Sequence, residues 1–190
     1  MGGYFVMHAR NRAKEVAFSS IVLALAFVLL YIGNISPADW SFIILTSFVL
    51  YLPYVLADNF LAGIWVVVGV NVLGYLFIPN VFYMLSFTFI SMYVPIRWLV
   101  RGKKEIIAWA LKFLYFNAAF FGWAFLLSTI LGIDIVSQMA RNASRIIPLS
   151  QNLVIFGVII FANLFFGGYE YVFKKVVWFE SKWVSRVLGE

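Results

Sequence analysis

The chain consists of long apolar runs separated by short polar breaks. Residues 21–30, for example, are apolar at every position. Such a run lacks the alternation of a barrel strand and the single apolar face of a helix at a protein surface. Backbone that faces lipid must satisfy its own hydrogen bonds, and a helix does so. The pattern therefore predicts transmembrane helices, each of roughly 20 residues because the hydrocarbon core is about 30 Å thick.

Helix-breaking positions divide these runs into six spans. Glycine, proline and polar breaks fall at residues 33–37, 79–80 and 101–102 and at Gly132, and a weaker polar boundary at 58–59 leaves the second and third spans as a tight hairpin. We predict an all-α, polytopic membrane protein with six transmembrane helices, in which residues 1-190 form a single domain. The predicted spans are about 13-32, 40-57, 60-78, 81-100, 106-131 and 152-173.

Composition excludes the water-soluble classes. Hydrophobic residues make up 64% of the chain and charged residues only 12%, and the mean hydropathy is +0.97. No soluble fold buries that much apolar surface. The first span is not a signal peptide, because it is too long, lacks a small-residue cleavage site and is followed by further spans.

The basic residues predict the orientation in the membrane. Eleven of the fourteen Lys and Arg residues fall in three clusters, at residues 10–14, 97–104 and 174–186. With the N-terminus inside, six spans place all three clusters on the cytoplasmic side, as the positive-inside rule requires. We therefore expect a multi-pass protein of the cell membrane with both termini cytoplasmic. The net charge of +6 then reflects topology and anionic lipid, and no nucleic-acid recognition motif accompanies it. Aromatic residues beside charges at 176–183 suit an interfacial tail.

The search for catalytic chemistry is negative. His8 is the single histidine, no P-loop sequence is present, and no two of the eight acidic residues share a helix face. Gly167 and Gly168 are too isolated for a phosphate cradle and indicate helix packing instead. We expect no enzymatic activity, no metal site and no cofactor.

Two charged residues stand at membrane depth. Lys112 lies about 10 Å into the fifth span, at 1.5 Å per residue, and Glu170 lies near the cytoplasmic end of the sixth. Charges in a membrane usually face the protein interior and find a partner, so the matching depths predict a structural ion pair. The alternative is that Lys112 extends to the inner headgroups and Glu170 is interfacial.

The first span carries a stripe of small residues. Steps of four, three and four residues place its members on one side of the helix, where another helix can approach closely. The partner is either another protein or this chain's own helices. The stripe consists of Ala13, Ala17, Ser20 and Ala24.

The chain begins with basic residues that run into Ala13 and Ala17. With this start, its length, six predicted spans and both termini inside, it resembles the substrate-binding S-component of energy-coupling factor (ECF) transporters. The resemblance implies that the stripe docks onto a transmembrane T-component and, through it, uses two ATPase subunits. It also implies capture of a micronutrient, usually a water-soluble vitamin, near the extracellular face. The chain departs from the family in its short first outer loop at 33–39, which bears on whether that loop can close over a ligand.

The resemblance places the substrate site among the outer halves of the last three spans and the adjoining loops. Flat aromatic rings there suit stacking, and amides, hydroxyls and Arg145 suit polar or anionic groups. Each has an alternative role: Trp40 and Tyr83 as interfacial belt residues, Arg141 and Arg145 as solvated charges, and Asn117, like Asn71 and Asn163, as a helix-to-helix hydrogen bond. The candidates are Asp39, Trp40, Tyr83, Ser86, Thr88, Asn117, Trp123, Arg145, Gln151 and Asn152, with Arg141 nearby.

A second class fits the same pattern. Cell-shape proteins of the MreD type are small, nonenzymatic, multi-span subunits, and in such a protein the stripe would be a scaffold contact. A scaffold should purify without a tightly held small molecule, whereas a high-affinity S-component should retain one. An intramembrane enzyme acting on lipid would need clustered acids, a Ser/Lys pair or metal ligands near one interface, and the sequence offers no such cluster.

Overall fold

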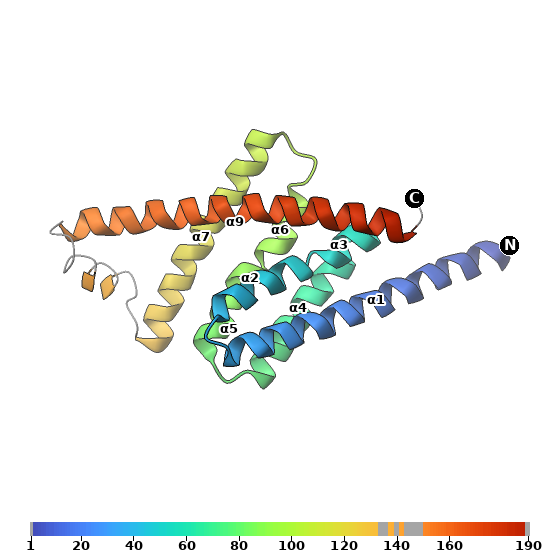
Figure 1. Cartoon of the computed structure of the whole chain (residues 1–190), viewed down its shortest axis with the longest axis horizontal. Helices are drawn as coiled ribbons and strands as arrows, with labels where there is room; N and C mark the ends of the chain where they lie inside the picture. Colours follow the sequence, from blue (N-terminus) through green and yellow to red (C-terminus); the bar gives the residue numbers. More distant parts are fainter. Residues whose placement is uncertain (1, 133–136, 139–140, 143–149, 189–190) are drawn as a thin grey trace. The chain divides into compact units, whose positions relative to one another are not determined.

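The computed structural model describes residues 2–132, 137–138, 141–142 and 150–188, and this part of the chain contains helices and no strand (Figure 1). Five of its helical stretches are long and apolar enough to cross a membrane. They are Ala13–Ile35, Asp39–Ala57, Phe60–Phe77, Glu105–Thr129 and Asn152–Glu180. The predicted spans at 13-32, 40-57, 60-78, 106-131 and 152-173 each overlap one of them.

The remaining predicted span, 81-100, is helical but interrupted. It consists of α5 (Val81–Ser91) and α6 (Tyr93–Leu99), which are separated at Met92. The second span is divided in the same way, into α2 (Asp39–Val49) and α3 (Leu52–Ala57).

Proline accounts for both interruptions. Its ring has no N–H and collides with the carbonyl four residues earlier, so a regular helix ends there. Four residues before Pro53 is Val49, where α2 ends, and four residues before Pro95 is Ser91, where α5 ends. Our prediction of two uninterrupted helices at 40-57 and 81-100 took the apolar runs into account but not these prolines.

Local capping explains three further boundaries. Asn59 Oδ1 accepts a hydrogen bond of 2.9 Å from the Leu61 amide at the start of α4 (Phe60–Phe77). Asn80 Oδ1 does the same for the Tyr83 amide at the start of α5, at 3.1 Å. Gly132 ends α7 (Glu105–Leu131) with a left-handed φ of 64°, a conformation that glycine adopts without strain.

The first and last helices are longer than their predicted spans. α1 runs over Gly2–Ile35 and α9 over Gln151–Leu188. Both therefore continue from the apolar stretch into the flanking basic residues.

The chain divides into two compact units, residues 1–101 with 175–190, and residues 102–174. In the first unit α1 packs against α2 and α4, α3 packs against α4, and α4 packs against α5 and α6 (Figure 1). The core of this unit includes Ala26 and Leu30 of α1 together with Val67 and Val70 of α4, all with no exposed surface. The prediction of a single domain stays a prediction.

The second unit consists of α7 and the first part of α9. Aromatic stacking joins the two helices, because the rings of Phe116 and Phe166 lie parallel with centroids 4.5 Å apart and Phe113 meets Phe166 edge-on at 5.3 Å. Most other large side chains of these helices are exposed, Leu114, Phe125 and Phe161 among them. The exposed residues recur at steps of three and four and so form one broad apolar face on each helix, which suits contact with lipid.

Candidate functional site

The hydroxyl groups of α5 that we proposed for substrate binding make hydrogen bonds within the first unit. Tyr83 is buried, and its hydroxyl donates to the carbonyl of Leu30 on α1 at 3.0 Å. Ser86 is also buried and donates to the carbonyl of Phe82, one turn earlier on its own helix, at 2.9 Å. Tyr83 thus ties α5 to α1, and Ser86 is satisfied by its own helix.

Thr88 belongs to a polar network between α4 and α5. Its hydroxyl oxygen lies 2.7 Å from Asn71 Oδ1 and 3.1 Å from the Tyr75 hydroxyl, both on α4. Asn71 Nδ2 donates in turn to the hydroxyl of Ser91 at 2.9 Å. A buried amide in a membrane helix needs such partners, and this network supplies them. Sequence reasoning named Asn71 and Thr88 separately and missed Ser91.

Asp39 and Trp40 lie at the start of α2. Asp39 is half-buried, and its Oδ1 accepts a hydrogen bond of 2.7 Å from the Trp40 amide. An acid in the first turn also interacts favourably with the helix dipole. The Trp40 side chain is 43% exposed. It is therefore the aromatic candidate of the first unit whose ring is accessible.

The amide candidate of the second unit, Asn117, pairs with Asn163. Asn117 Nδ2 donates to Asn163 Oδ1 at 2.9 Å, and Asn163 Nδ2 donates back to Asn117 Oδ1 at 3.1 Å. Each Nδ2 also donates to the carbonyl one turn earlier on its own helix. This reciprocal pair joins α7 to α9 and uses both amides for helix packing.

The remaining substrate candidates have varied positions. Trp123 is half-buried with its ring stacked 6.3 Å from Phe120, and Asn152 is exposed near the start of α9. Arg141, in the adjoining segment, is exposed. Arg145 and the side chain of Gln151 lie outside the described residues.

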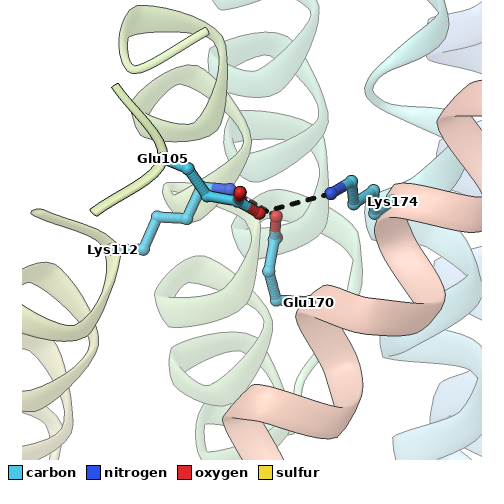
Figure 2. A network of polar contacts seen from close by, with 4 residues as sticks. All are labelled: Glu105, Lys112, Glu170 and Lys174. Carbon is cyan, nitrogen blue, oxygen red and sulfur yellow. Dashed lines mark hydrogen bonds and ion pairs between the residues drawn. The ribbon is translucent and has the colours of Figure 1, made fainter. Parts of the chain in front are cut away.

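Lys112 and Glu170 form an ion pair between α7 and α9 in the second unit. Lys112 Nζ donates to Glu170 Oε1, with only 12% and 1% of the respective side chains exposed. Nearer the start of α7, Glu105 and Lys174 form a second pair at 3.6 Å whose side chains are 70% or more exposed. Figure 2 shows the charged ends of the four side chains meeting between the two helices.

The two pairs differ in energetic character. When two charged side chains are buried together, both lose their hydration and gain a close contact with each other. Removing one of them therefore removes the contact that compensates the other for its lost hydration. An exposed pair contributes about 0–1 kcal/mol. Breaking the inner pair should therefore weaken the association of α7 with α9 more than breaking the outer pair. The centroid of the Trp109 ring lies 5.5 Å from Lys112 Nζ and adds a favourable cation–π contact.

The small-residue stripe of α1 faces away from the rest of the first unit. Ala13, Ala17, Ser20 and Ala24 are all exposed. The opposite side of the helix, which includes Val22 and Ala26, is buried against α2 and α4. The stripe is therefore not used for packing among the described helices of this unit. Its one polar group is satisfied, because the Ser20 hydroxyl donates to the Val16 carbonyl at 2.8 Å.

Sequence reasoning missed a cluster at the end of α6. Arg101 forms an ion pair of 2.8 Å with Asp58, the C-cap of α3, and its guanidinium also lies over the Trp98 ring. Arg97 is buried, with its guanidinium 5.1 Å from the centroid of the Tyr51 ring. We had counted both arginines only as topology signals. The nearby Tyr51 and Trp98 would have indicated this second role.

Comparison with family models, with curated proteins and with solved structures gave no match to this chain. Its function is therefore argued from its own residues.

Proposed function

We propose that the protein is the substrate-capture subunit of an ATP-driven micronutrient importer. A micronutrient such as a water-soluble vitamin binds from outside, and a separate T-component, coupled to two ATPase subunits, docks on α1. ATP is hydrolysed on those subunits, and the capture subunit reorients in the membrane against the T-component. This assignment follows the resemblance to ECF S-components.

The observation that carries the proposal is the exposed stripe of α1. Small side chains let a second helix approach closely, which is the main source of affinity between helices in lipid. Leu and Ile side chains would serve contact with lipid equally well, so lipid does not call for Ala13, Ala17, Ser20 and Ala24 on one side of the helix. The stripe therefore favours docking of a partner helix.

Six spans with both termini cytoplasmic form part of the same proposal. The Arg101–Asp58 ion pair joins the end of α3 to the end of α6, so the chain returns to the same level after α4, α5 and α6. Since α4 is long enough to cross, we infer that α5 and α6 together form the return crossing. The hydrogen bond from Tyr83 to Leu30 likewise joins the start of α5 to the far end of α1. These contacts support a crossing by residues 81–99, although the two helices are individually short.

To be bound by these residues, a substrate must replace some of the hydrogen bonds that they make within the chain. Trp40, which is exposed beside Asp39, is the residue best placed to meet an incoming ring. A ligand that reached Thr88 or Asn117 would replace the bonds to Asn71 and Asn163. Because the replaced bonds are neutral ones, worth about 0.5–1.5 kcal/mol each, this exchange is energetically accessible.

The test is a double substitution of the stripe, Ala13→Trp with Ala17→Trp. Two indole rings prevent close helix approach, so we expect the partner complex and uptake to be lost while the isolated protein still binds its ligand. The matched control is Leu25→Trp, which adds an indole at an exposed position of α1 to the side of the stripe. Uptake that survives the double change places the docking surface elsewhere.

Capture itself is tested by native mass spectrometry of the purified protein. A retained small molecule supports the importer. A protein that carries none, but still loses a protein partner on the double change, fits the second candidate, an MreD-type membrane scaffold. The observation in favour of that candidate is that Tyr83, Thr88 and Asn117 all make hydrogen bonds within the chain.

A further inference from the structure

The last helix is much longer than a bilayer crossing requires. α9 has 38 residues, which at 1.5 Å per residue amount to about 57 Å against a hydrocarbon core of about 30 Å. The part that exceeds the core begins at the adjacent Lys174 and Lys175. Lysine pairs at such a position mark the level of the headgroups.

Beyond this level the helix has one exposed side with both lysine and aromatic residues. Lys175, Trp178 and Lys182 are exposed, and their spacing of three and four residues places them on one stripe. Phe179 flanks the stripe and is 65% exposed. Val176 is only partly exposed and lies away from the stripe. We refer to Lys175, Trp178, Phe179 and Lys182 as the α9 surface.

The four residues of the α9 surface include two lysines and no acid. Glu180 is the single acidic residue between 174 and 188. Its Oε2 is buried, so this carboxylate is directed toward the protein and away from the surface. The Lys182 ammonium lies 5.0 Å from the centroid of the Trp178 ring, which brings cation and ring together at one place.

The geometry points to an anionic-lipid binding site on the α9 surface. Lysine ammonium groups attract the phosphates of anionic headgroups, and an exposed indole and phenyl ring need the apolar phase directly beneath those phosphates. A soluble acidic partner would satisfy the lysines but would leave Trp178 and Phe179 in water. The helix also emerges from the bilayer at this point, so the headgroups are within reach. This inference requires a membrane but not the capture function.

The test exploits the absence of cysteine from the chain. The full protein with Phe179→Cys is spin-labelled and reconstituted in nanodiscs of phosphatidylcholine alone or of phosphatidylcholine with phosphatidylglycerol. Power saturation with oxygen and a water-soluble nickel chelate then reports the depth of the label. We expect the label to shift from aqueous to headgroup depth when phosphatidylglycerol is present, and to return to aqueous depth at high salt.

Removing the lysines should abolish the shift. Lys175→Gln with Lys182→Gln should weaken the preference for phosphatidylglycerol by about fivefold for each lysine. The control is Lys103→Gln with Lys104→Gln, which removes the same charge from two exposed residues before α7 and should leave the shift unchanged. A label at equal depth in both lipids, or a shift that survives the loss of Lys175 and Lys182, overturns the proposal. An aqueous label in both lipids would direct attention to a protein partner instead.

Discussion

Several polar side chains in the apolar helices of this protein form hydrogen bonds with side chains of a neighbouring helix. The amides of Asn117 and Asn163 bond each other, Asn71 bonds Thr88 and Ser91, and each link joins two helices. In hydrocarbon no water replaces a missing partner, so each such group gains from a specific helix neighbour. These hydrogen bonds therefore favour the pairing of α4 with α5 and of α7 with α9.

The ion pair between Lys112 and Glu170 yields a prediction at this scale. Lys112→Met or Glu170→Gln alone should lower the unfolding free energy by about 3–5 kcal/mol, because each breaks a buried ion pair by removing one of its two charges. The double variant should lose less than the sum of the two. Thermal unfolding in detergent, followed by circular dichroism, measures both effects.

The exposed pair provides the control for this prediction. Glu105→Gln should change stability by about 1 kcal/mol or less, since its contact with Lys174 is solvated. Unaltered melting of both Lys112→Met and Glu170→Gln would show that the inner pair does not stabilise the association of α7 with α9.

At the scale of helices, close packing depends on glycine where an aromatic ring must fit. Gly63 on α4 lies directly against the ring of Tyr54, which has no exposed surface. Tyr51, Phe60 and Trp98 surround that ring, with centroids 5.4 to 6.2 Å from it. The ring therefore has no space into which it can move, and α3 and α4 approach closely only because Gly63 has no side chain.

Gly63→Ala should accordingly destabilise the protein by about 1–3 kcal/mol through overpacking. Gly122→Ala is the matched change, because Gly122 is also helical but has no neighbouring atom within 4 Å of an added Cβ. That substitution should be neutral or stabilising by up to about 1 kcal/mol, since alanine favours the helix. Chemical unfolding of the two variants in the same detergent compares them. Equal stabilities would contradict the close approach of Tyr54 to Gly63.

At the scale of the whole molecule, the question is how often the chain crosses the membrane. Hydropathy and length support five crossings by described helices. The Arg101–Asp58 contact favours a further crossing by α5 and α6. Under our proposal of six crossings, the basic C-terminal segment returns to the side of the basic N-terminal one, as the charge distribution predicts.

Single cysteines introduced into this cysteine-free chain test the topology. Pro79→Cys, before α5, should react with an impermeant maleimide in intact cells, and Lys103→Cys, after α6, should react only once the membrane is opened. Both positions are exposed. Labelling of both in intact cells would show that residues 81–99 do not cross, and the reverse pattern would invert the orientation.

Some features could be predicted from the sequence because they depend only on residues that lie close together along the chain. The caps at Asn59 and Asn80 and the end of α7 at Gly132 follow from local chemistry that each residue carries by itself. The breaks before Pro53 and Pro95 were equally local, and the prediction overlooked them. The candidate substrate residues were harder, because their partners, such as Leu30 for Tyr83, are distant in sequence.

By itself, the sequence determined the helical membrane class, most helix boundaries and the asymmetry of charge, since hydropathy, capping and charge are properties of position along the chain. The folded arrangement of the helices was needed to show that Lys112 meets Glu170 and that Asn117 meets Asn163. It also showed that the side of α1 with Ala13 and Ala17 is exposed while the side with Ala26 packs. The physical reason is that these helices are apolar all round. No polar face then indicates which side is buried, and the choice depends on close packing and on partners far apart in the chain.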